Sequence, residues 1–221
     1  MQLALLFTDE LRGFYKSKVM IFLWVGLPLI ALLFRFIQAG MTGQEIPFTL
    51  ISSLVVSSIG GTLAAVMLAV FLINEKNRHV YDLFLIRPIK RRDILLAKFF
   101  SVYTCVAIAS AIAVLAGILT DYATTGALAT NVLTDAGQSL ATSLSMIAVS
   151  CAAGVLIGVV SPSVLVGAIL VIYGGNQISV IPLVPALFNL PEATLFTIVI
   201  AVVVAAGLLA GAVALFNKKQ F

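Results

Sequence analysis

The sequence predicts an all-α integral membrane protein: six transmembrane helices, an N-terminal amphipathic interfacial helix, and a cytoplasmic coupling helix between the second and third spans. Composition and long apolar stretches predict this class. The chain has 221 residues, of which 62% are hydrophobic and 10% charged, whereas soluble domains are about 45–50% apolar and about 25% charged. This composition excludes a soluble globular protein and a disordered chain.

The first 18 residues have the periodicity of an amphipathic helix. Leu3, Phe7, Leu11 and Phe14 recur at steps of three or four residues, and charged side chains lie on the opposite side. Such a helix lies in the membrane surface with its apolar face in the lipid. We expect it to anchor the chain in lipid, and a lever beside moving spans is the functional alternative.

The apolar stretches that follow are helices rather than barrel strands, because they do not alternate between apolar and polar residues. A helical crossing needs about 20 mainly apolar residues. We expect spans near residues 19–37, 50–73, 99–119, 136–160, 164–181 and 194–216. Residues 1–221 then form one transmembrane domain, with too little left over for a separate catalytic domain.

The basic residues predict the orientation of these spans. Three precede the first span, seven lie in residues 74–98 and two follow the last span, so 12 of the 13 lie on one side. By the positive-inside rule, both termini and the loop 74–98 are cytoplasmic in a cell membrane. Arg35 is the exception: it lies near the outer end of the first span, where it can reach the headgroups, and a place in a substrate path is its alternative role. The net charge of +4 therefore needs no nucleic-acid partner.

The cytoplasmic loop 74–98 is too long for a turn and too short for a domain. Val80, Leu83 and Phe84 share one helical face, and Pro88 ends that helix. Asp93 then occupies the position of a helix cap before the third span. An apolar patch just below the bilayer needs lipid headgroups or a protein partner to cover it.

This loop resembles that of the permease subunits of type-2 ABC transporters, which are exporters. The family's loop has a glutamate, a helical stretch ending in a leucine pair, a proline, basic residues, an acid, an aliphatic run and a lysine. The matching residues are Glu75, Phe84, Leu85, Pro88, Arg91, Asp93, Ile94, Leu95, Leu96 and Lys98. His79 and Val80 stand where the family often has glycine and threonine, a departure that suggests a subfamily with a differently packed coupling helix.

The resemblance implies a permease that works as a homodimer or a pseudo-symmetric heterodimer and docks its coupling helix into an ABC ATP-binding subunit. ATP and magnesium would bind that partner subunit, since this chain has no GxxxxGK[ST] loop. We expect no cofactor, no metal and no catalytic residue in the chain itself. The implied ATPase-coupling interface consists of Glu75, Val80, Asp82, Leu83, Phe84, Arg87 and Pro88.

Three other functions stay open. The haem-handling permease subunit of cytochrome c maturation has a similar length and loop order. A membrane scaffold or assembly subunit would use the same coupling helix without moving cargo. An integral-membrane enzyme is the third, although its chemistry needs grouped acids or a His/Asp/Ser set, and the nine acids here are scattered.

Few polar residues lie inside the predicted spans. Asn176 and Gln177 follow Gly174 and Gly175 in the fifth span, where the helix can loosen and the amides can line a pathway. The alternative is amide-to-backbone bonding between packed helices. The apolar lining that these spans imply favours hydrophobic or amphipathic cargo over small ions.

Two glycine pairs have GxxxG spacing, Gly154 with Gly158 and Gly207 with Gly211. Such pairs let two helices approach closely, within one subunit or across a dimer. Cys105 and Cys151 lie in apolar stretches, without CxxC spacing, and are interpreted as small core residues.

Overall fold

The computed structural model describes residues 2–16, 18–39, 56–78, 91–125, 130–188 and 193–218. The regular structure in these ranges is entirely helical, which confirms the predicted all-α class. Five of the described helical stretches are long and apolar enough to cross a membrane, which indicates a multi-pass membrane protein. These stretches are Val56–Asn77, Arg92–Thr120, Ala136–Val160, Val164–Leu183 and Thr194–Lys218.

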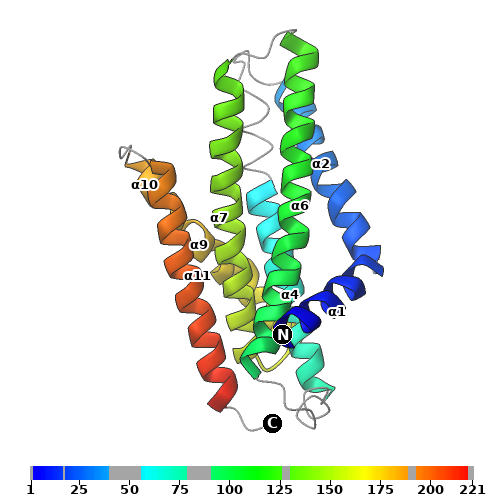
Figure 1. Cartoon of the computed structure of the whole chain (residues 1–221), viewed down its shortest axis with the longest axis vertical. Helices are drawn as coiled ribbons and strands as arrows, with labels where there is room; N and C mark the ends of the chain where they lie inside the picture. Colours follow the sequence, from blue (N-terminus) through cyan, green and yellow to red (C-terminus); the bar gives the residue numbers. More distant parts are fainter. Residues whose placement is uncertain are drawn as a thin grey trace.

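The N-terminal region forms two helices, α1 (Gln2–Lys16) and α2 (Lys18–Ala39). α1 lies across the lower part of the bundle, and α2 rises beside α6 (Figure 1). A helix over Gln2–Lys16 thus lies within the range of the predicted N-terminal helix, and its place in the membrane surface stays a prediction. α2 coincides with the first predicted span, but its apolar part within the described side chains is the shorter stretch Ile21–Ile30. The side chain of Arg35 lies outside the described part.

Helices α4 (Gly61–Asn77) and α7 (Thr130–Val160) pack against each other along the centre of the bundle. A five-residue π-helix, η1 (Val56–Gly60), precedes α4. A Cβ atom on Gly154 would lie 2.5 Å from the carbonyl oxygen of Ala65, and one on Gly158 would lie 3.0 Å from the Cα atom of Ala69. This first GxxxG pair therefore brings two helices of the same chain together. The contacts of Gly154 and Gly158 with Ala65 and Ala69 are called the glycine seam below.

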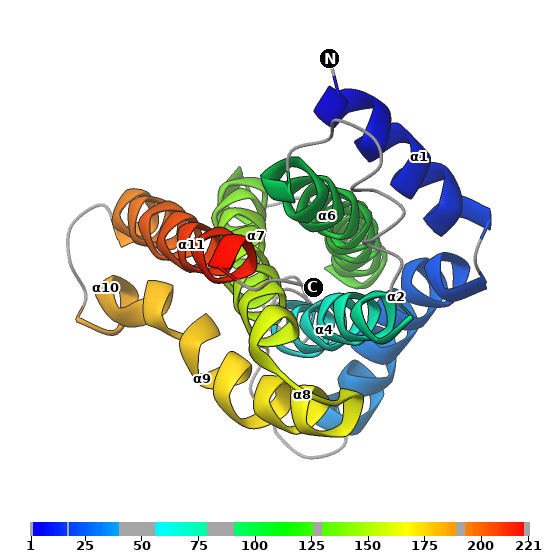
Figure 2. The ribbon, with the colours of Figure 1, turned by 90° about the horizontal axis from the view of Figure 1, so that it is seen from below.

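Helices α6 (Arg91–Thr125) and α11 (Ala193–Lys218) pack on α7. α6 also contacts α1 and α2, and α1 covers the outer side of α6 when the bundle is seen from below (Figure 2). Trp24 of α2 donates from Nε1 to the carbonyl oxygen of Cys105 on α6 at 3.2 Å. Cys105 and Cys151 are both buried free thiols, which agrees with their interpretation as core residues.

The fifth predicted span lies in the helical stretch Val164–Leu183, in which the helix type changes along the chain. The π-helix ends at Gly175, so the predicted loosening at Gly174 and Gly175 is confirmed. A π turn widens the helix and breaks its regular pattern of hydrogen bonds. The segments are α8 (Val164–Leu170), η2 (Val171–Gly175), α9 (Asn176–Ser179), η3 (Ile181–Leu183) and α10 (Val184–Leu187).

Both flanking helices extend into the predicted loop 74–98. α4 continues to Asn77 and α6 already includes Arg91, so Glu75 and Lys98 are helical residues. Asp93 lies in the first turn of α6 instead of capping it, and a carboxylate there stabilises the helix dipole. Charged residues mark where lipid ends, but they do not by themselves end a helix.

Candidate functional site

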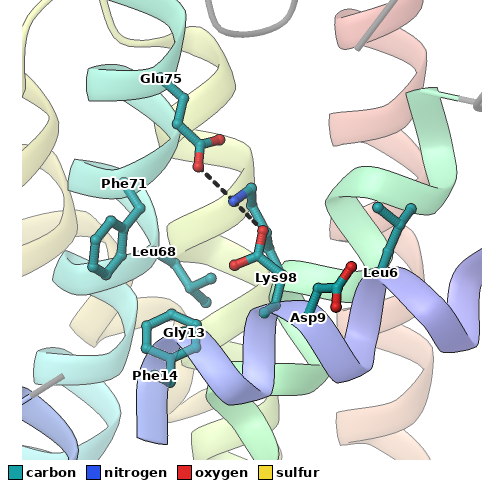
Figure 3. Close-up of a pocket in the computed structure, with 9 residues that line it drawn as sticks. Leu6, Asp9, Gly13, Phe14, Leu68, Phe71, Glu75 and Lys98 are labelled. Carbon is teal, nitrogen blue, oxygen red and sulfur yellow. Dashed lines mark hydrogen bonds and ion pairs between the residues drawn. The ribbon is translucent and has the colours of Figure 1, made fainter. Parts of the chain in front are cut away.

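Three charged residues from three helices meet at the lower end of the bundle. The Nζ atom of Lys98 on α6 lies 2.6 Å from Glu10 Oε1 on α1 and 2.6 Å from Glu75 Oε1 on α4. Figure 3 shows Lys98 and Glu75 extending toward one another from α6 and α4. These three residues are called the charged cluster below.

Helical spacing accounts for the convergence of these side chains. Residues three or four apart lie on the same face of a helix. On α1, Glu10 shares the inward face with Leu6 and Phe14, of which Phe14 is buried. On α6, Lys98 shares its face with Leu95 and Val102, which are both fully buried. Glu10 and Lys98 are therefore placed in the contact by the apolar residues that share their helix faces.

The charged cluster is held by strong, partly buried interactions. The side chain of Lys98 is only 7% exposed, whereas Glu10 and Glu75 are 30% and 25% exposed. A buried ammonium group needs a compensating charge and hydrogen bonds, and two charge-assisted bonds supply both. With two carboxylates and one ammonium, the cluster carries a net charge of −1 when all three are ionised. Lys98 consequently links α1 and α4 through one atom.

A half-open cavity of about 440 Å³ lies beside the charged cluster. The rings of Phe14 and Phe71 meet edge to face in its wall, with centroids 5.5 Å apart. Most of the lining is apolar, and the volume is within the range of small-molecule pockets, about 300–1,000 Å³. The lining residues are Leu6, Asp9, Glu10, Gly13, Phe14, Leu68, Phe71, Glu75 and Lys98 (Figure 3).

A second polar contact joins α4 to the end of α7. Lys76 Nζ donates to the carbonyl oxygen of Ser161 at 3.4 Å, just beyond the last residue of α7. A cation at a helix C-terminus interacts favourably with the carbonyl groups that have no helical partner there. Glu75 and Lys76 thus connect the last turn of α4 to α6 and to the residue that follows α7.

Of the predicted coupling residues, only Glu75 lies in the described part of the chain, and it belongs to the charged cluster. The other six predicted coupling residues lie outside the described residues. They are Val80, Asp82, Leu83, Phe84, Arg87 and Pro88. Their segment is bounded by the ends of α4 and α6, which carry Glu75 and Lys98.

The candidate pathway residues lie elsewhere. Asn176 and Gln177 are the first two residues of α9, directly after the π-helix, and α9 contacts α4 and α7. Asn176 is half-buried and Gln177 is exposed. The Asn176 carbonyl oxygen accepts a 2.6 Å hydrogen bond from Ser179 Oγ. Neither residue lines the cavity beside the charged cluster, and their role in a pathway stays a prediction.

Sequence reasoning missed Glu10 as a site residue and treated Lys98 only as a basic residue and a family match. A signal for Glu10 was present, because it falls between Leu6 and Phe14 at spacing four on the side of α1 that packs inward. An acid at such a position needs a buried cationic partner. The identity of that partner, 88 residues away, is not readable from helical spacing.

The chemistry available here is ionic and apolar. Among the described residues, no group of three or more His, Cys, Asp or Glu side chains is placed to hold a metal ion.

No family model matches the sequence, and no curated protein matches it significantly. The site itself therefore carries the functional argument.

Proposed function

We propose that this chain is the transmembrane permease subunit of an ABC-type exporter, driven by ATP hydrolysis in a separate ATP-binding subunit. The observation that supports this best is the position of the charged cluster. It joins α1, α4 and α6 beside the two helix ends that flank residues 79–90, the segment that resembles the family's coupling helix. A force applied to that segment acts directly on α4 and α6.

In this proposal the N-terminal helix moves with the spans. Lys98 holds Glu10 of α1 and Glu75 of α4 at 2.6 Å each, so a displacement of α6 is passed to both helices through short ionic contacts. Packed helices and ion-pair networks carry such coupling when they have two arrangements. The proposal places six spans in the cell membrane, with α2 as the first, and both termini in the cytoplasm. It also has two permease chains pair to form the pathway.

Docking of the ATP-binding subunit is tested by changing the apolar face of the coupling segment. The double variant Leu83→Asp, Phe84→Asp places two charges in a contact that excludes water, and we expect it to insert normally and to lose the ATP-binding subunit in co-purification. A matched control is Asn217→Asp, Lys218→Asp, at exposed positions at the end of α11. Co-purification of the double variant at the level of the native chain would contradict the proposal.

Transport is tested in sealed vesicles that contain the permease and its ATP-binding subunit. We expect cargo movement only with ATP and both subunits present. A complex that assembles and hydrolyses ATP without any flux would instead indicate a scaffold. Turnover of a lipid-linked substrate by the chain alone would indicate an enzyme.

A further inference from the structure

The cavity between α1 and α4 has polar and apolar parts on different sides. Phe14, Leu68 and Phe71 form an apolar wall, and Phe71 is 38% exposed although it belongs to a helix in the bundle. Asp9, Glu10 and Glu75 supply carboxylates on the same cavity. An aromatic wall next to carboxylates is the chemistry that recognises a cation attached to an apolar group.

The electrostatic character of the opening follows from which charges are accessible. Three carboxylates and one ammonium line the cavity, so its ionised lining has a net charge of −2. The side chain of Lys98 is 7% exposed, and its ammonium group contacts two carboxylates. The side chains of Glu10 and Glu75 are 30% and 25% exposed. Asp9 is exposed. An approaching ligand therefore meets carboxylate oxygens rather than the ammonium.

We propose that this cavity binds an organic ammonium group that carries an apolar chain. The ammonium lies against Asp9 and the exposed part of Glu10, and the apolar chain lies against Phe14 and Phe71. Two sources supply this chemistry: the ethanolamine headgroup of a phospholipid, or a free amphiphilic amine. The proposal does not depend on the export function, since it concerns binding alone.

Other ligand classes fit less well. An anion would be repelled by three carboxylates. A hard metal cation prefers six or more oxygen ligands, and among the described residues no group of three or more His, Cys, Asp or Glu side chains has the arrangement to hold a metal ion. A wholly apolar ligand would desolvate the exposed carboxylate of Asp9 without offering it an opposite charge.

Gly13 offers a way to fill the cavity without touching the charged cluster. It lines the cavity, and a Cβ atom built on it meets nothing within 4 Å. Gly13→Trp therefore places an indole in the open space. Gly137→Trp is the matched control, because Gly137 on α7 is exposed and also has open space around its Cβ position. Gly13→Ala controls for the loss of glycine alone.

Binding is measured on the full chain in a neutral maltoside detergent by isothermal titration calorimetry. The probes are decyltrimethylammonium and, as a charge-reversed control of equal chain length, decyl sulfate. Native mass spectrometry of the same sample with added phosphatidylethanolamine or phosphatidylglycerol tests the lipid source. Elution volume and helical circular dichroism establish that each variant is folded.

We expect saturable binding of the cationic probe, retention of phosphatidylethanolamine over phosphatidylglycerol, or both. Gly13→Trp weakens this binding at least roughly tenfold by filling the cavity, and Asp9→Asn weakens it about threefold by removing one exposed charge. Gly137→Trp and Gly13→Ala leave it unchanged. Binding of neither ammonium source, equal binding of decyl sulfate, or ammonium binding unaffected by Gly13→Trp overturns the proposal.

Discussion

The central helix α4 is held in two different ways on two of its faces. Toward α7 it uses the glycine seam, where small residues bring two backbones into direct contact. Toward α1 and α6 it uses the charged cluster, where three long side chains meet beside a cavity. The seam depends on shape and tolerates no added atom, whereas the cluster depends on charge and leaves open space beside it. α4 and α7 are therefore joined by close backbone contact, whereas α4 is linked to α1 through the side chains of the charged cluster.

The largest expected effect comes from removing the cation of the charged cluster. Lys98→Met leaves two carboxylates facing each other in a partly buried site, and we expect a loss of about 3 kcal/mol in the free energy of unfolding. Unfolding in detergent, followed by circular dichroism, measures this loss. The triple variant that also carries Glu10→Gln and Glu75→Gln should recover much of it. A triple variant no more stable than Lys98→Met would show that the carboxylates do not repel each other.

The glycine seam is broken by one methyl group. Gly154→Ala places a Cβ atom 2.5 Å from the carbonyl oxygen of Ala65, so the two helices must separate, at a cost of about 2 kcal/mol. Gly207→Ala on α11 is the matched control, because nothing lies within 4 Å of its Cβ position. The same unfolding measurement compares the two. Equal stability of both variants would mean that α4 and α7 are not in close contact.

A smaller effect separates the two arms of the charged cluster. Glu10→Gln keeps an oxygen acceptor for Lys98 but removes the charge, and we expect a cost of about 1 kcal/mol. A double-mutant cycle with Lys98→Met isolates the interaction. Crosslinking of α1 to α6 should fall in Glu10→Gln while the glycine seam stays intact. A coupling energy of zero would show that Glu10 on α1 does not interact with Lys98.

The smallest effect has the opposite sign. Gly13 lies within α1, where glycine is less favourable than alanine by roughly 0.5–1 kcal/mol. Its Cβ position is open, so Gly13→Ala should raise the stability of α1 by up to that amount. Hydrogen exchange of the α1 amides measures the change. Faster exchange in the variant would show that this position is crowded.

The all-helical, multi-pass character of this protein follows from length and apolar composition, and five described helical stretches are long and apolar enough to span a membrane. The helix ends were harder: the second span was predicted to end near residue 73 and a cap was predicted at Asp93, whereas α4 continues to Asn77 and α6 already includes Arg91. The contact between Glu75 and Lys98 bridges 23 residues and the contact between Lys98 and Glu10 bridges 88. Such pairings depend on how helices pack in three dimensions, which periodicity within one helix does not contain.

The glycine seam also shows what a spacing motif does not specify. Gly154 with Gly158 and Gly207 with Gly211 have the same spacing, yet only the first pair meets a backbone at close range, while a Cβ on Gly211 would lie 3.8 Å from Leu156 Cδ1. The difference depends on the facing residue. Ala65 and Ala69 are small enough for close approach, and their position opposite α7 is a property of the fold.

The hydrogen bond between Trp24 and the backbone of α6 gives this protein an intrinsic optical probe. Trp24 is the only tryptophan in the chain, and its indole nitrogen donates to the carbonyl oxygen of Cys105. The wavelength of maximum indole fluorescence shifts with the polarity and hydrogen bonding around the ring. Any rearrangement that separates α2 from α6 would therefore appear in the fluorescence of the unlabelled protein, in real time and without an engineered dye.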